Sequence, residues 1–350
     1  MKKLKFIENI NLNREKWDLC VQKSINRKVY VLSWYLDIVT DRWDALVYGD
    51  YELIFPIVSK SRFCLKFMFQ PLFCQQLGPF SPYKELLYNS EVIYSIWNFI
   101  FQRFRLFTFS TNYHVSEFFK NSDFFKKKMN ISVSNRINLE LDLSKNYNQL
   151  RAHYSNNTKR NLGRITSRTR KGFITTNDYC IKTMNDVPEF ITFFQNNLHQ
   201  KVNLKNNDYT IMLNLISTCL NKKTGTPAFY TVAASVTEVA GSLLGLYDTK
   251  NQLLASVFFL HVFNRHILLF NVSKIGSDIS LMTYLIDQYI QTNCRTQTEV
   301  LNKSNNPYGH CNINPILDFE GSNITGVKRF YQGFGAVEKN YNLFTRRFFN

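Results

Sequence analysis

The stretch that decides the fold is ILDFEGSNITGVKRFYQGFGA, residues 316–336. Its apolar start predicts a short buried strand that ends in two carboxylates, Asp318 and Glu320. Gly321 then permits a turn that a Cβ would obstruct, and the polar residues after it can cap a helix. Carboxylates at a strand end beside a helix start are well placed to hold an amine or to relay its proton.

The same residues also permit a purely structural interpretation. Asp318 and Glu320 can accept hydrogen bonds from backbone N–H groups at the turn, while Gly333 and Gly335 only end the helix. Strained turns are common and active sites are few, so the residue types alone favour this structural interpretation.

Outward from this stretch, the second half of the chain predicts helices, then antiparallel strands, then a returning helix. We expect four helices: one at 147–171, one that starts at the D-x-x-E capping box of Asp186, one that starts at Asp208, and one at 279–291. We expect strands at 229–235, 242–247, 253–263 and 267–272. This order is typical of an α+β domain.

The first half predicts a similar succession of helices and hairpins. Residues 43–58 contain two strand-like runs that meet at Gly49-Asp50, a strong hairpin signal. We also expect a helix at 30–39, strands at 64–70, 74–78 and 105–111, a helix around Val92–Ile100, and a half-buried strand at 131–143.

The length and the net charge of the chain limit its possible functions. A chain of 350 residues exceeds what one hydrophobic core usually serves, so two domains are expected. The formal net charge of +17 attracts anions, so phosphorylated cofactors, RNA and an anionic lipid surface are all plausible partners. The charge does not choose among them.

The thiols and the apolar runs indicate a cytoplasmic protein without a membrane span. Seven cysteines are scattered without a C-x-x-C pair, as in reduced cytosolic proteins. The start, MKKLKFIENI, lacks the apolar core of a signal peptide, and residues 253–263 are too few to span a bilayer. Six histidines show no ligand spacing, so we predict no structural metal.

Several motifs together give a family resemblance over nearly the whole chain. DFEGS followed by a helix and FYQGFGA resembles the C-terminal signature of FemAB-type aminoacyl transferases and related GNAT-like acetyltransferases. WYLDIVTDRWDALV (34–47), QPLFCQQLGPFS (70–81) and YSNNTKRNLGR (154–164) agree in order. The sequence also lacks the G-x-S-x-G and H-E-x-x-H motifs, which suits acyl transfer to an amine, a reaction that needs few specialised side chains.

The resemblance implies two tandem GNAT-like α+β domains with mixed, mostly antiparallel sheets flanked by helices. The expected boundaries are 1–145 and 146–350, with a last strand at about 337–349 that can pack with the first domain. The implied activity is N-acyl transfer from a thioester or aminoacyl-tRNA to an amine bound between the domains, a small amine or a cell-wall or lipid precursor. The splayed strand around 253–263 is expected to supply oxyanion donors.

The resemblance also assigns roles to particular residues. Asp318 and Glu320 are the expected catalytic carboxylates, either of which can orient or deprotonate the amine. The expected substrate contacts are Trp34, Tyr35, Gln70, Gln75, Gln76, Ser322, Lys328 and Tyr331. On residue types alone, Trp34 and Tyr35 are also consistent with core aromatics.

One departure from the acetyl-CoA-binding pattern leaves the donor open. GNAT domains that bind acetyl-CoA carry a glycine-rich loop whose N–H groups cradle the pyrophosphate. The equivalent stretch here is NVSKIGSDISLMTY, residues 271–284, where that glycine pattern is missing. FemAB-type proteins, which take aminoacyl-tRNA, have a similarly degraded loop, but tRNA-using members often carry a coiled-coil arm that this sequence lacks. Acyl-CoA and aminoacyl-tRNA both stay possible.

The second constellation is a basic stretch, residues 143–177, that contains eight cations and no acid. Arg160, Arg164 and Arg168 repeat every four residues, so on a helix they form one stripe, with Lys159 beside it. The stripe suits phosphates of tRNA, a nucleotide-linked substrate or a peripheral contact with an anionic membrane. A solvated helix face is the structural alternative. A non-catalytic basic protein of the same fold, binding nucleic acid or a membrane surface, is therefore the alternative function.

Overall fold

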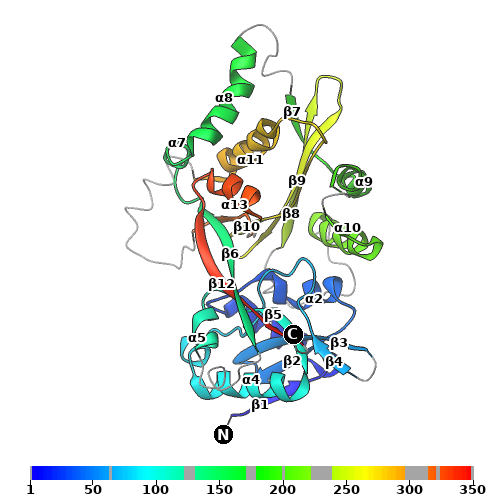
Figure 1. Cartoon of the computed structure of the whole chain (residues 1–350), viewed down its shortest axis with the longest axis vertical. Helices are drawn as coiled ribbons and strands as arrows, with labels where there is room; N and C mark the ends of the chain where they lie inside the picture. The colour runs from blue at the N-terminus through cyan, green and yellow to red at the C-terminus, as the bar shows by residue number, and fades with distance from the viewer. Residues whose placement is uncertain are drawn as a thin grey trace. The chain divides into compact units, whose positions relative to one another are not determined.

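The computed structural model describes residues 2–62, 65–121, 131–170, 179–198, 202–221, 239–295, 314–320 and 324–347. These residues divide into two compact units (Figure 1). Of the described residues, unit 1 holds those within 2–137 and 339–347, and unit 2 holds those within 138–338. Strands β6 (Ser132–Asp142) and β12 (Val337–Arg346) each contribute residues to both units.

Unit 1 is a mostly antiparallel sheet with helices. Its strands are hydrogen-bonded in the order β1-β2-β3-β4-β5-β12-β6, with β4 and β5 parallel. Besides β6 and β12, its elements are β1 (Leu4–Ile7), η1 (Asn9–Asn11), α1 (Arg14–Lys23), η2 (Val29–Val31), α2 (Ser33–Val39), β2 (Trp43–Tyr48), β3 (Leu53–Arg62), β4 (Leu65–Met68), α3 (Lys84–Leu87), α4 (Ser90–Arg103), β5 (Leu106–Ser110) and α5 (Ser116–Lys120).

The predicted hairpin between β2 and β3 is confirmed. Tyr48 pairs with Leu53, and Gly49 in the turn has φ +61°, a conformation that side chains with a Cβ rarely adopt. A Cβ there would also lie 2.1 Å from Glu52 Oε2. The local sequence therefore determines this turn.

Helix α4 forms the core of unit 1 with the sheet. Asn89 caps it by accepting hydrogen bonds from the N–H groups of Glu91 and Val92. Its apolar face then packs on aromatic residues of the strands, Trp97 lying 5.8 Å from Phe109 between ring centroids. Complete burial of each such side chain stabilises the fold by roughly 1.5–3 kcal/mol.

Unit 2 is a second mostly antiparallel arrangement, in the order β6-β11-β10-β9-β8-β7, with β10 and β11 parallel. Its remaining elements are α7 (Tyr147–Ala152), α8 (Asn156–Arg170), β7 (Tyr179–Thr183), α9 (Val187–Leu198), α10 (Asn206–Asn221), β8 (Ala240–Asp248), β9 (Leu253–Val262), β10 (Arg265–Ser273), α11 (Ile279–Asn293), β11 (Ile316–Asp318) and α13 (Thr325–Gln332). The expected meander and returning helix are present, except that 229–235 lies outside the described residues.

Three local predictions were wrong. The helix expected at 147–171 is two helices, α7 and α8, because Ser155 leaves the helical path and donates its N–H to Gly333 O (2.9 Å). The helix expected at 30–39 begins as the 3-10 turn η2, and Leu32 is extended before α2 starts. Residues 74–78 form only an isolated bridge, Leu77 with Thr111, instead of a strand.

The class of fold is the expected mixture of helices with a mostly antiparallel sheet. It differs in one respect, because the twelve described strands follow a single hydrogen-bonded order instead of two separate sheets. Of the helices in the described ranges, none is both long and apolar enough to cross a membrane.

Candidate functional site

The DFE turn follows strand β11 in unit 2. The Glu320 N–H donates to Asp318 Oδ1 (3.0 Å), and Glu320 has φ +50°, a left-handed conformation uncommon for residues other than glycine. Phe319 N–H donates to Leu139 O of β6 (2.9 Å). The expected strand end is therefore present, whereas the turn expected at Gly321 lies outside the described residues. The Asp318 side chain accepts a hydrogen bond from the backbone that follows it, as the structural interpretation of the motif required.

Asp318 also belongs to a buried ionic cluster that sequence reasoning missed. Arg265 Nη2, at the start of β10, lies 2.7 Å from Asp318 Oδ2 and also donates to Glu140 Oε1 of β6. Glu140 Oε1 accepts a further hydrogen bond from Asn138 Nδ2 (3.1 Å). All three charged side chains are at least nine-tenths buried. The sequence offered one signal of this cluster, namely the charged residue Glu140 between Leu139 and Leu141 in a predicted strand.

Tyr331 of α13 lies against the same region. Its hydroxyl accepts a hydrogen bond of 2.7 Å from Asn271 Nδ2 of β10, and its ring stacks on Phe319 at 4.8 Å. Burial raises the pKa of Tyr331 to about 12, and the charge of Glu320 acts in the same direction. The phenol is therefore neutral at physiological pH, and its own proton is available to a second acceptor.

Strands β10 and β11 diverge at this point. They pair in parallel only from Arg265 with Ile316 to Ile267 with Asp318. Beyond Ile267, the described part of β10 continues along β9 with a bulge between Leu268 and Phe270, while the chain after Asp318 follows β6. Strand β9 itself is paired with β8 and β10 along most of its length. The expectation that the strand around 253–263 is splayed was therefore wrong, and in the described residues the divergence lies between β10 and β11.

The loop before α11 differs from a phosphate cradle. Gly276 has φ +78°, but Asp278 occupies the N-cap of α11 and accepts from the Ser280 N–H (2.9 Å). Arg164 Nη1 of α8 lies 3.9 Å from Asp278 Oδ1. The Asp278 carboxylate thus occupies the N-terminus of α11, where the helix would otherwise attract a phosphate group.

The basic stripe lies partly within the described residues. Lys159, Arg160 and Arg164 are exposed on α8, whereas the side chain of Arg168 lies outside the described residues. Lys159 Nζ donates to Ala152 O (2.9 Å) and Arg160 Nη2 to Asn157 Oδ1 (2.7 Å). Their charges therefore face solvent as expected, while each side chain also makes a local hydrogen bond.

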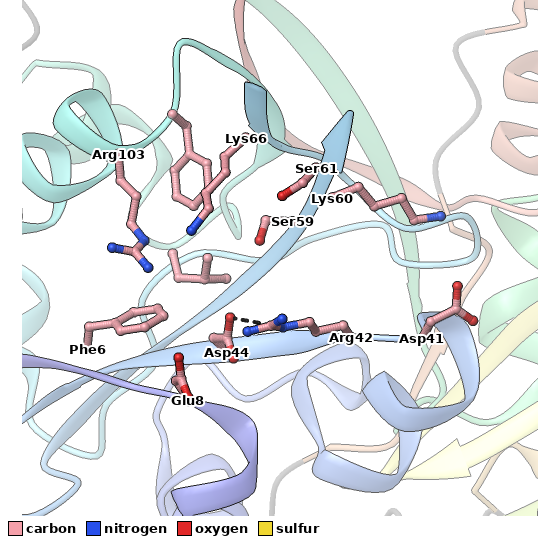
Figure 2. A pocket seen from close by; sticks show the side chains of 12 residues that line it. Phe6, Glu8, Asp41, Arg42, Asp44, Ser59, Lys60, Ser61, Lys66 and Arg103 are labelled. Atoms are coloured by element: carbon pink, nitrogen blue, oxygen red, sulfur yellow. Dashed lines mark ion pairs between the residues drawn. The ribbon is translucent and has the colours of Figure 1, made fainter. Parts of the chain in front are cut away.

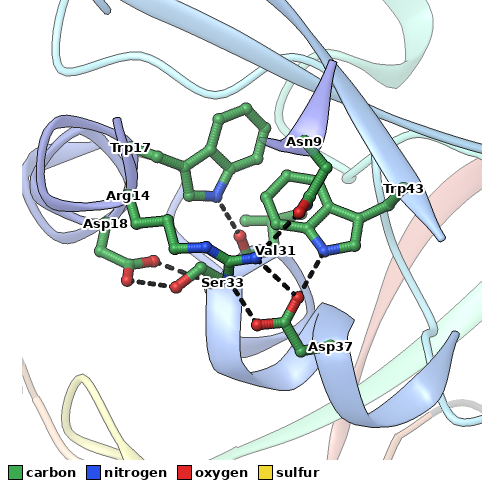
Figure 3. A network of polar contacts seen from close by, with 8 residues as sticks. All are labelled: Asn9, Arg14, Trp17, Asp18, Val31, Ser33, Asp37 and Trp43. Atoms are coloured by element: carbon green, nitrogen blue, oxygen red, sulfur yellow. Dashed lines mark hydrogen bonds and ion pairs between the residues drawn. The ribbon is translucent and has the colours of Figure 1, made fainter. Parts of the chain in front are cut away.

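Trp34 and Tyr35 lie on α2 in unit 1. Both are buried, with ring centroids 5.4 Å apart, and the Tyr35 hydroxyl donates to Phe73 O (2.6 Å). Figure 3 shows the polar network that fixes α2 against α1: Asp18 accepts from both the N–H and the hydroxyl of Ser33 (2.8 and 2.6 Å). Burial raises the pKa of Asp18.

The network continues around Asp37 of α2. Arg14 pairs with Asp37, and Trp43 Nε1 donates to Asp37 Oδ1 (2.9 Å) (Figure 3). These contacts fix α2 in place. The burial of Trp34 and Tyr35 on that helix agrees with the interpretation of both as core aromatics.

The three glutamines predicted as substrate contacts, Gln70, Gln75 and Gln76, hold the irregular segment around 70–76. Gln70 donates to Cys74 O (2.6 Å) and accepts from the Ser110 N–H (2.8 Å). Gln76 is fully buried, donates to Gln75 Oε1 (2.6 Å) and accepts from the Tyr113 N–H (3.1 Å). Their amides thus replace the strand hydrogen bonds that this segment lacks.

Two predicted contacts remain, Lys328 of α13 and Ser322. Lys328 Nζ pairs with Glu338 Oε1 at 2.7 Å, and Ser322 lies outside the described residues. Unit 2 therefore brings Asp318, Glu320 and Tyr331 into one region, whereas Trp34, Tyr35 and the glutamines belong to unit 1. The described residues contain no group of three or more His, Cys, Asp or Glu side chains placed to hold a metal ion.

Comparisons with known proteins agree on the fold. No protein-family model matches the sequence, and no curated protein matches it at a significant level. Among solved structures, FemX is similar with a TM-score of 0.58, 8% identity, and coverage of 97% of this chain and 96% of that chain. A conserved protein of unknown function from Bacteroides thetaiotaomicron gives 0.55, 10% identity and 99% coverage of both chains. L-PGS from Bacillus licheniformis gives 0.51, 10% identity, and 90% and 87% coverage. The chain therefore has a FemAB/GNAT-like fold.

Proposed function

We propose that the chain is an N-acyltransferase that moves an acyl or aminoacyl group from a thioester or ester donor to an amine. The observation that carries the proposal is the position of Glu320 and Tyr331, a carboxylate and a neutral phenol beside the divergence of β10 and β11. A base and an acid beside the point where two paired strands diverge suit acyl transfer to an amine.

In the proposed reaction, Glu320 takes the proton that the attacking amine loses as its nitrogen bonds to the carbonyl carbon. Backbone N–H groups of β10 beyond Ile267 stabilise the oxyanion. Tyr331 gives its proton to the leaving sulfur or oxygen as the carbon–heteroatom bond breaks. The proton held by Glu320 then restores the phenol, so amine and donor yield an amide and a free thiol or alcohol. Asp318 and Arg265 position the turn.

Because the negatively charged Asp278 caps α11, we favour an acyl donor whose phosphate groups bind away from the N-terminus of this helix. An aminoacyl-tRNA ester meets this condition, because its nearest phosphate contacts can fall on the exposed cations of α8. A thioester donor would place anionic phosphates against the Asp278 carboxylate, if it bound as in the acetyl-CoA pattern. We therefore favour aminoacyl-tRNA over acyl-CoA.

The experiment is a transfer assay with aminoacyl-tRNAs and acyl-CoAs as donors and a panel of primary amines, followed by mass spectrometry of the amide. Tyr331→Phe and Glu320→Gln are each expected to lower turnover by about a hundredfold or more. Tyr209→Phe, which removes a different buried hydroxyl of unit 2, is the matched control and should retain full activity. Normal turnover in both site variants would refute the assigned roles.

The exposed cations of α8 support the second candidate function, a non-catalytic protein that binds nucleic acid. If this function is correct, Arg160→Gln with Arg164→Gln weakens RNA binding and flattens its salt dependence. Glu320→Gln then leaves binding unchanged, and no donor yields an amide. Transfer activity in the first assay would rule this alternative out.

A further inference from the structure

A pocket of about 470 Å³ lies in unit 1, and none of its lining residues belongs to the proposed transferase site (Figure 2). Strands β1 to β4 and the end of α4 form its walls. Buried Ile57 and Phe104 supply its apolar lining. The volume falls within the range of small-molecule sites.

The sequence explains why the pocket exists at this place. Residues 53, 55, 57, 59 and 61 of β3 share one face of the sheet, because side chains alternate along a strand. The first three are Leu, Phe and Ile in the core with α4, whereas the last two are Ser59 and Ser61, which are not buried. The face thus changes from apolar to polar, and Arg103 at the end of α4 lines the pocket together with the two serines.

Two cations form one side of the pocket. Figure 2 shows the side chains of Lys66 and Arg103 directed into the same space, with the Ser59 hydroxyl beside them. The guanidinium of Arg103 also lies 4.6 Å from the centroid of the Phe6 ring. Among the described residues, no carboxylate lies within 4.0 Å of either cation. An arginine, a lysine and a hydroxyl together suit a carboxylate ligand.

Two acids form the opposite side. Asp44 of β2 is buried and accepts a hydrogen bond from the Asn9 N–H (3.1 Å), with Arg42 Nε 3.7 Å away. The Glu8 carboxylate points toward the same space in Figure 2. A polyanion would meet these two acids unfavourably, whereas a ligand with a positive end would pair with them.

We propose that this pocket binds a small zwitterion with a free ammonium group and a free carboxylate, an amino acid or a short peptide. The carboxylate contacts Lys66, Arg103 and Ser59, and the ammonium group faces Asp44 and Glu8. A volume of about 470 Å³ exceeds one small amino acid and accommodates a few residues. The inference does not depend on the proposed acyl transfer.

The test uses isothermal titration calorimetry of the full chain with trialanine, alanine, N-acetyl-trialanine and trialanine amide at low salt. Unblocked trialanine is expected to bind, and removal of either terminal charge is expected to weaken binding about tenfold or more. Binding of alanine as tight as that of trialanine would identify an amino-acid site, and weaker binding a peptide site; both agree with the proposal. Equal binding of the blocked and unblocked peptides, or no binding of any zwitterion, would overturn it.

Variants locate the binding in the pocket. Lys66→Met is expected to weaken trialanine binding about tenfold. Lys60→Met is the matched control, because Lys60 lines the same pocket but its ammonium lies 5.0 Å from the Phe69 ring centroid and points away in Figure 2. Equal losses in both variants would show a general charge effect, and preferential binding of inorganic phosphate would show an anion site; either result refutes the proposal. Thermal melting of each variant checks the fold.

Discussion

Arg265 Nη2 lies 2.7 Å from Asp318 Oδ2, so the start of β10 is tied to the end of the strand that carries the DFE turn. The same nitrogen donates to Glu140 of β6. One guanidinium therefore joins three neighbouring strands just before β10 and β11 diverge. Because the ion pairs are buried, the desolvation of each member is offset only while the others are present.

Replacing Arg265 is expected to lower the free energy of unfolding strongly. Arg265→Met leaves two buried carboxylates without their cation, at a cost of about 3–5 kcal/mol. Urea denaturation followed by circular dichroism measures this change. Arg164→Met is the control, because its pair with Asp278 is half exposed at 3.9 Å and contributes about 0–1 kcal/mol. Similar small losses in the two variants would show that the cluster contributes little.

The glycines of the signature stretch are expected to respond differently to alanine. A Cβ at Gly333 would lie 2.4 Å from Thr158 Oγ1 and 2.9 Å from Phe330 O, so Gly333→Ala should destabilise the fold by about 1–3 kcal/mol. A Cβ at Gly326 meets nothing within 4 Å, and Gly326→Ala should be neutral or stabilise α13 by up to about 1 kcal/mol. Thermal unfolding of both variants tests the contrast, which an equal effect would contradict.

The parts of the fold that the sequence predicted are those determined by neighbours in the chain. The hairpin at Gly49 depends on a turn, and the D-x-x-E box begins α9 through the hydrogen bond of the Glu189 N–H to Asp186 Oδ1 (2.9 Å). The break between α7 and α8 was not predictable, because Ser155 donates to Gly333, 178 residues later. Local periodicity contains no information about such a contact.

The candidate site was predictable to the same extent. The strand, the turn and Tyr331 are adjacent in the sequence, so the signature located them. Glu140 and Arg265 are separated from Asp318 by 178 and 53 residues, and only the pairing of β6, β10 and β11 brings the three together. Arg265, the ionic partner of Asp318, could therefore not be identified from residue types alone, because only the pairing of strands in the folded chain brings the two side chains together.

Stability at acid pH is expected to depend on two histidines of unit 2. The Tyr289 hydroxyl lies 2.6 Å from His266 Nδ1 and 2.9 Å from His261 Nε2. Burial, with the neighbouring His266, lowers the pKa of His261 to about 4, and burial lowers that of His266. The unfolded state therefore binds more protons below pH 6.5, so this stability is complete above pH 6.5 and is lost as the pH falls toward 4.

The loss attributable to His261 is expected to be about 2–3 kcal/mol. Urea denaturation at pH 7 and pH 4.5 should show a smaller difference for His261→Gln than for the unmodified chain. His153→Gln, which changes an exposed histidine, should keep the original difference. If the two variants respond alike, the buried pair is not the group that titrates.

Stability at alkaline pH is expected to report on Tyr331. Its pKa is raised from 10 to about 12, first by burial and then by the charge of Glu320, so the folded state retains a proton that the unfolded state releases. The contribution is complete below pH 10 and is lost as the pH rises through 12, a change of about 2–3 kcal/mol. Tyr331→Phe should remove this part of the alkaline loss, and Glu320→Gln should move its midpoint to lower pH. An unchanged midpoint in Glu320→Gln would show that the carboxylate does not act on the phenol, and the proton return from Glu320 to Tyr331 would then lack support.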